Sequence, residues 1–130
     1  MKKLSTTFAT LMALIGSSFA GPLDGVWINT DAATGSIPKV EITGNQLVWW
    51  GKTHPRDSKY GPMPLTLLGD SVGDGSPGKY GYVTEDVKFA SHVMIMKRVG
   101  EHLVIETLMV FKDGSKRANT LETLTFKKQS

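Results

Sequence analysis

The chain has 130 residues, of which 40% are apolar and 21% are charged, and it contains 14 Gly, 6 Pro and no Cys. This composition is typical of one soluble folded domain and excludes collagen-like, disordered and polytopic membrane proteins. Fifteen basic and 12 acidic residues give a formal net charge of +3. The length excludes a large α/β barrel, since single domains usually contain about 100 to 150 residues and such barrels about 250.

The first twenty residues have the three regions of a secretory signal peptide. Two lysines follow the initial Met, residues 4–15 are mostly apolar, and residues 16–20 end in small side chains before the cleavage point. A membrane span needs about 20 apolar residues, and this run is interrupted by Ser and Thr. We therefore expect cleavage after Ala20, a single mature domain of residues 21–130 in the periplasm or outside the cell, and no membrane attachment.

Loss of the signal peptide changes the charge of the protein. Removing Lys2 and Lys3 leaves 13 basic against 12 acidic residues, a formal net charge of +1. The remaining basic residues are scattered along the chain, whereas nucleic-acid-binding proteins gather them on one face beside exposed aromatic side chains. We expect no nucleic-acid partner.

Eight segments of the mature chain are rich in β-branched and aromatic residues and are bounded by turn residues, as strands are. They are Gly25–Asn29, Ile37–Thr43, Gln46–Gly51, Leu65–Leu68, Tyr80–Thr84, Val87–Val99, His102–Lys112 and Arg117–Lys127. Gly44-Asn45 and Asp113-Gly114-Ser115 are hairpin turn signals. The sequence predicts an all-β fold, an antiparallel up-and-down meander closing into a small barrel of about eight strands.

Two adjacent predicted strands are apolar on both faces. In His102–Lys112, Leu103, Ile105, Met109 and Phe111 share one face, and Val104, Leu108 and Val110 share the other. The strand Val87–Val99 shows the same pattern. Because a large exposed apolar patch is unusual for a monomer, a second copy, a loop or a partner protein should cover the outer face. Of these we expect a homodimer.

Two long loops interrupt the meander, at Lys52–Pro64 and Gly69–Lys79. Loops of this length in a compact domain are mobile or functional. The second loop is rich in Gly and Asp, but it lacks the closing Glu and flanking helices of an EF-hand and the Gly-Lys-Ser/Thr of a phosphate-binding loop. We expect a flexible loop without a ligand there.

The segment from Trp49 to Gly61 concentrates the residues suited to binding. Consecutive strand residues point to opposite faces, so one of Trp49 and Trp50 should be core and the other a surface contact or ligand platform. The candidate binding residues are Trp50, His54, Arg56, Asp57 and Tyr60.

The sequence gives little indication of a catalytic site or a metal-binding site. His54 beside Asp57 could act as a base or a metal ligand, or the two could hold the loop by hydrogen bonds, as polar turn residues usually do. The three histidines show no zinc-ligand spacing, and there is no Gly-x-Ser-x-Gly turn or Cys nucleophile. We expect no catalytic residue, no metal and no cofactor, and therefore no enzyme.

Gly25-Val26-Trp27 resembles the Gly-x-Trp opening of the lipocalin and avidin-like barrels, the calycin group. In that group a basic residue of the last strand lies over the Trp. The resemblance implies that Lys127 or Lys128 takes this place.

The segment from Trp50 to Gly61 resembles the loop Trp-Gly-x-Cys-His-Pro-x-x-Cys-x-Trp-Gly of small bacterial proteins, mostly of uncharacterised function. Thr53 and Ser58 replace the two Cys, and Tyr60 replaces the second Trp. Joint loss of both Cys is what one expects of a disulfide pair that pins the loop. The resemblance implies a fold and a loop of interest, without a substrate.

Three functions remain open. The first is a non-enzymatic binding module that holds a small molecule or a partner at the barrel mouth and the loop 50–61, where Met94, Met96 and Met109 could line an adaptable pocket. The second is a protein-interaction or inhibitor module acting on a hydrolase in the same compartment. The third is a small enzyme. An interior filled by Trp27, Trp49, Met94 and Phe111 would favour the second.

Overall fold

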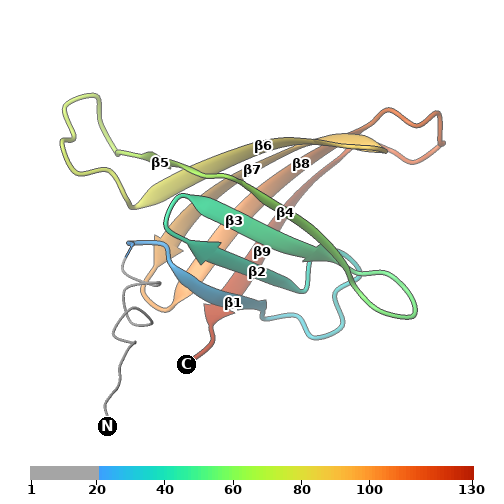
Figure 1. The fold of residues 1–130 in the computed structure, drawn as a ribbon, viewed down its shortest axis with the longest axis horizontal. Helices are drawn as coiled ribbons and strands as arrows, with labels where there is room; N and C mark the ends of the chain where they lie inside the picture. The colour runs from blue at the N-terminus through green and yellow to red at the C-terminus, as the bar shows by residue number, and fades with distance from the viewer. Residues whose placement is uncertain (1–20) are drawn as a thin grey trace, which may run out of the picture.

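The computed structural model describes residues 21–130, so the predicted signal peptide at residues 1–20 lies outside the described residues. The described chain is all-β (Figure 1). No helix in this part of the chain has the length and apolar character needed to cross a membrane. Its nine strands are β1 (Gly25–Asn29), β2 (Lys39–Thr43), β3 (Gln46–Gly51), β4 (Ser58–Pro64), β5 (Thr66–Leu68), β6 (Tyr80–Val87), β7 (Ala90–Val99), β8 (His102–Phe111) and β9 (Thr120–Lys128).

The strands form one antiparallel sheet in the order β4-β3-β2-β1-β9-β8-β7-β6-β5. Every sequence neighbour pairs except β4 with β5, and the first strand pairs with the last through Trp27 opposite Lys128 and Asn29 opposite Phe126. The two edge strands, β4 and β5, are joined by the single residue Leu65. The sheet is therefore a nearly closed barrel (Figure 1), and the predicted up-and-down meander is confirmed.

Strand β4 is the element that the sequence analysis missed. Residues 58–64 were expected in a loop because the segment contains Gly61, Pro62 and Pro64, and they instead pair with β3. An edge strand tolerates proline, since one side of its backbone has no sheet partner. Gly61 has φ of 100° and lies where the register with β3 shifts, and a Cβ there would meet the carbonyl oxygen of Leu47 at 2.7 Å.

Alternation along the strands fills the interior. Trp27, Trp49 and Phe126 are at most 2% exposed, and a cluster of aliphatic side chains and methionines packs around them. Met94 and Met96 belong to this core. The expectation that Trp49 and Trp50 face opposite sides is confirmed, because Trp49 is buried and Trp50 lies half-buried on the outer face.

Trp27 closes one end of the barrel. Its indole N–H donates to the carbonyl of Leu23 at 3.0 Å, and the Lys128 ammonium and the Arg98 guanidinium lie 6.0 Å and 5.4 Å from its ring centroid. Of the two lysines expected near Trp27, Lys128 is the one whose ammonium group lies over the ring. Gly25, with φ of 145°, lies under the Lys128 stem, where a Cβ would come within 2.9 Å of Cε.

The outer face of β6 to β9 exposes apolar side chains, as the double-sided pattern of two strands predicted. No segment among residues 21–130 covers them. They include Tyr82, Ile95, Val99, Leu108, Val110 and Leu121, which are between 38% and 71% exposed. The homodimer expected to cover this face stays a prediction.

Replacing Trp27 with Ala should destabilise the domain by about 3 to 5 kcal/mol, because a large buried aromatic side chain leaves a cavity. Urea unfolding followed by circular dichroism measures the change. Trp50→Ala is the matched control on the outer face and should cost about 1 kcal/mol or less. A loss below about 1 kcal/mol for Trp27→Ala would show that this residue does not plug the barrel.

Candidate functional site at the barrel mouth

A pocket of about 640 Å³ opens at the end of the barrel opposite Trp27. Its walls come from the loop between β1 and β2, the end of β3 with the residues that follow it, and β4, together with the turn between β6 and β7, β8, β9 and the connection between β8 and β9. This volume is within the range of small-molecule sites, about 300 to 1,000 Å³. The barrel interior beside Trp27 is filled, although a surface hollow of about 660 Å³ at that end is lined by Pro22, Arg98 and Glu101 among others.

Aromatic side chains form one wall of this pocket. The rings of Trp49 and Tyr60 stack at 4.2 Å between centroids, and Tyr60 contacts Phe89 edge to face at 6.3 Å. Phe89 in turn stacks at 6.3 Å against Phe111. Such pairs are worth about 0.5 to 1.5 kcal/mol each beyond their buried area, so the wall is a rigid apolar surface. Met109 also lines the pocket.

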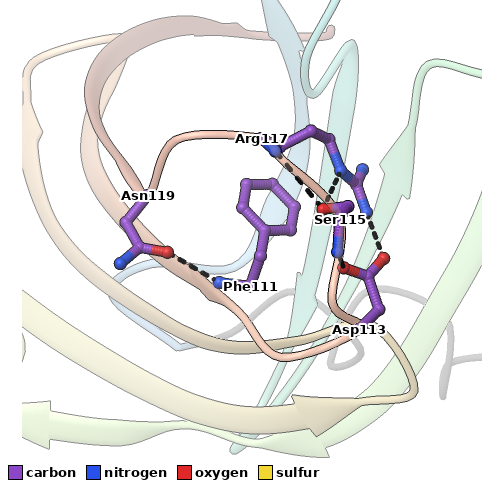
Figure 2. A network of polar contacts seen from close by, with 5 residues as sticks. All are labelled: Phe111, Asp113, Ser115, Arg117 and Asn119. Carbon is purple, nitrogen blue, oxygen red and sulfur yellow. Dashed lines mark hydrogen bonds and ion pairs between the residues drawn. The ribbon is translucent and has the colours of Figure 1, made fainter.

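The connection between β8 and β9 places a guanidinium on this wall. Arg117 lies over the Phe111 ring at 4.0 Å and 5.4 Å from the Phe89 ring centroid. Its Nε donates to Ser115 Oγ at 3.2 Å, and one terminal nitrogen donates to Asp113 at 2.6 Å (Figure 2). The backbone N–H of Phe111 donates to Asn119, which closes the base of the loop.

The network fixes Arg117 without using all of its donors. Hydrogen bonds from Ser115, and to a smaller extent the Arg117 guanidinium, hold the pKa of the Asp113 carboxyl below its usual value, so the ion pair persists at neutral pH. The Arg117 side chain is still 52% exposed. A planar guanidinium has five donor hydrogens, and those left free can bind an anionic group at the rim.

A buried histidine lies beneath the aromatic wall. His92 is 2% exposed, its Nε2 is hydrogen-bonded to the hydroxyl of Thr107, and its ring meets Trp49 edge to face at 4.9 Å. Thr107 lines the pocket floor. Burial lowers the pKa of His92 to about 4. The imidazole is therefore neutral at pH 7 and a weak base, so the pair acts as a polar support for the wall.

The structure separates the residues predicted to bind. Of the five, Tyr60 lines the pocket, and Trp50 lies on the outer face of the barrel wall. His54 and Arg56 are exposed on the loop that connects β3 to β4, and Asp57 forms an ion pair of 3.8 Å with Lys52.

Hydrogen bonds from Thr53 close the loop from β3 to β4. Its hydroxyl lies 2.9 Å from that of Ser58 and also donates to the carbonyl of Arg56. Among residues 21–130 the side-chain hydrogen bonds across this loop come from Thr53 and none comes from His54, whereas Asp57 contributes its ion pair with Lys52.

Sequence reasoning missed the residues that dominate the pocket. Phe89, Phe111 and Arg117 were assigned to strands, with no site proposed. His92 lies in the predicted strand Val87–Val99, and no local sequence signal identifies Thr107 as its partner. The described residues contain no group of three His, Cys, Asp or Glu side chains that could hold a metal ion. The barrel mouth is suited to a flat, partly apolar molecule that lies against the aromatic rings and contacts the Arg117 guanidinium at the rim.

Comparisons with protein families, with curated proteins and with solved structures found no match to this chain.

The buried His92 makes stability depend on pH. Unfolding returns its pKa from about 4 to 6.5, so between these values the unfolded chain binds more protons and stability falls as pH falls. We expect the domain to lose about 2 kcal/mol between pH 7.5 and pH 5. Urea unfolding at the two pH values measures it.

His92→Gln should remove most of that loss, and His102→Gln, which changes an exposed histidine on β8, should keep it. Equal pH dependence in the wild type and His92→Gln would contradict the assignment.

The facing hydroxyls of Thr53 and Ser58 predict that Cys at both positions forms a disulfide. The closed loop is short, so the stabilisation should be about 2 kcal/mol. The chain has no other Cys, so thiol titration after air oxidation and thermal unfolding report the bond directly. Thr53→Cys alone is the control and should gain nothing. If two free thiols remain after oxidation, the side chains at positions 53 and 58 do not face each other across the loop.

Proposed function

We propose that this protein is an exported, non-enzymatic binding protein of the periplasm or extracellular space, which holds a small molecule in the mouth of its barrel. The observation that carries the proposal is the pocket of about 640 Å³ with a stacked aromatic wall and the Arg117 guanidinium at its rim. Export rests on the signal-peptide pattern of residues 1–20.

The side chains that line the mouth pocket indicate which class of small molecule it binds. The stacked rings of Trp49, Tyr60, Phe89 and Phe111 favour a flat apolar or aromatic body. The free donors of Arg117 favour a carboxylate or sulfonate on that body. A filled barrel base restricts the ligand to the mouth, so the ligand is small and partly exposed when bound.

The dye 8-anilinonaphthalene-1-sulfonate combines a flat aromatic body with a sulfonate and is a suitable probe. We expect saturable binding to residues 21–130, measured by dye fluorescence. Arg117→Gln should weaken binding by about tenfold, because a hydrogen bond to a charged group contributes more than 1 kcal/mol.

Lys116→Gln is the matched control, since it removes the same charge from an exposed neighbour in the same loop. Leu121→Gln tests the outer apolar face as a rival dye site. Equal binding by the wild type and Arg117→Gln, with loss in Leu121→Gln, would refute a mouth site.

A protein-interaction or inhibitor module is the second candidate. Two observations favour it. Trp27, Trp49 and Met94 are buried and fill much of the interior, and residues 54–56 are exposed together on the loop from β3 to β4. Under this function His54→Ala with Arg56→Ala would abolish inhibition of a hydrolase and leave dye binding unchanged, so the same variants separate the two functions.

A further inference from the structure

One row of outward-facing side chains crosses five neighbouring strands in register. Lys127 of β9 lies opposite Ile28 of β1, and Ile28 lies opposite Lys39 of β2. Lys39 lies opposite Trp50 of β3, and Trp50 lies opposite Lys59 of β4. The outer rung, as we name these five residues, therefore alternates a lysine with an apolar side chain.

All five residues of the outer rung are on the outer face, since their strand neighbours Phe126, Trp27, Val40, Trp49 and Tyr60 point inward. Lys59 and Lys127 are exposed, and the other three are half-buried. A shallow hollow of about 370 Å³ adjoins Ile28 and Lys127. The outer rung is thus accessible along its whole length.

The charges of the outer rung are not neutralised within the fold. Among residues 21–130, none of its three lysines forms an ion pair. The ammonium groups of Lys39 and Lys59 lie 4.2 Å and 5.8 Å from the centroid of the Trp50 ring instead. The one carboxylate on the same face of β2 is that of Glu41, two residues from Lys39, so the row keeps a net positive charge.

The spacing of the lysines selects the kind of anion. Neighbouring strands lie about 5 Å apart, so the backbones of successive lysines of the outer rung are about 10 Å apart, with one apolar residue between them. A nucleic-acid strand carries a charge about every 3.4 Å, far denser than this row. A flat anionic membrane would touch only part of a row that follows the curved barrel wall. A flexible chain with sparse charges fits both features.

We propose that the outer rung binds a linear acidic polysaccharide with a carboxylate on every second sugar. The carboxylates pair with the three lysines. Lys39 and Lys59 thereby leave the Trp50 ring, and the uncharged sugars lay their C–H faces on Ile28 and on the ring so exposed. This site is on the barrel wall and is independent of the mouth pocket.

Hyaluronan, which carries one carboxylate in each pair of sugars, is the probe, and neutral dextran is its control. We expect the chain of residues 21–130 to bind immobilised hyaluronan and not dextran, with affinity falling as salt is raised. Trp27 and Trp49 are buried, so acrylamide quenching reports mainly Trp50, and hyaluronan should protect it from quenching.

The triple variant Lys39→Gln, Lys59→Gln, Lys127→Gln should bind hyaluronan about tenfold more weakly, because each exposed ion pair contributes a few-fold. The matched control is Lys88→Gln, Lys97→Gln, Lys116→Gln, which removes the same charge from exposed lysines outside the outer rung and should keep wild-type affinity. Both variants should unfold at the wild-type urea concentration.

Equal loss of affinity in the two triple variants would overturn the proposal, since it would show a response to net charge alone. Failure to bind hyaluronan would overturn it as well. Preferential binding to single-stranded DNA or to anionic phosphatidylglycerol vesicles would do the same and would identify the rival partner. Dye binding at the mouth should be unchanged in the triple variant, so the two proposals fail independently.

Discussion

The pairing of β1 with β9 is the constraint on which the rest of the structure depends. Without it the strands would form two separate sheets, β1 to β4 and β5 to β9, and Trp27 would have no enclosed space to fill. With it, Trp27 and Lys128 lie opposite each other at one end, and the other end becomes a mouth. Closure also removes two exposed sheet edges, which leaves only the short β5 and the proline-containing β4 as edges.

The buried polar groups of this domain, which has no disulfide, are satisfied by hydrogen bonds. The buried Asp24 carboxylate accepts the backbone N–H groups of Gly21 and Gly44, each at 2.9 Å. Asn29 donates to the carbonyl of Ile37, and His92 pairs with Thr107. The Asp24 bonds join the turn before β1 to the turn between β2 and β3, and the other two join a strand to a loop or to a neighbouring strand.

The alternation of strand residues lets one wall carry two different surfaces. Trp49 and Trp50 are adjacent in the chain, yet Trp49 supports the aromatic mouth and Trp50 lies in the outer rung. The same is true of Lys59 and Tyr60 in β4. Strand β3 and its edge neighbour β4 therefore contribute side chains to both proposed sites, the mouth pocket on the inner face and the outer rung on the outer face.

The sequence by itself determined the fold class and most strands, because period-two alternation and turn residues are local signals. The bounds of β1 and β3 and the opposite orientation of Trp49 and Trp50 all followed from these signals. Strand β4 was missed because Gly61 and its prolines are read locally as loop, and only pairing with β3 makes the segment extended.

Only the tertiary structure decided which residues gather at each surface. Tyr60 was found from the sequence, but Arg117, Phe89 and Phe111 reach the mouth through the packing of three strands and two connections. The lysines of the outer rung are scattered along the chain, which argued against any basic face. They form a row because strand register places residues 28, 39, 50, 59 and 127 side by side, and register depends on closure of the whole sheet.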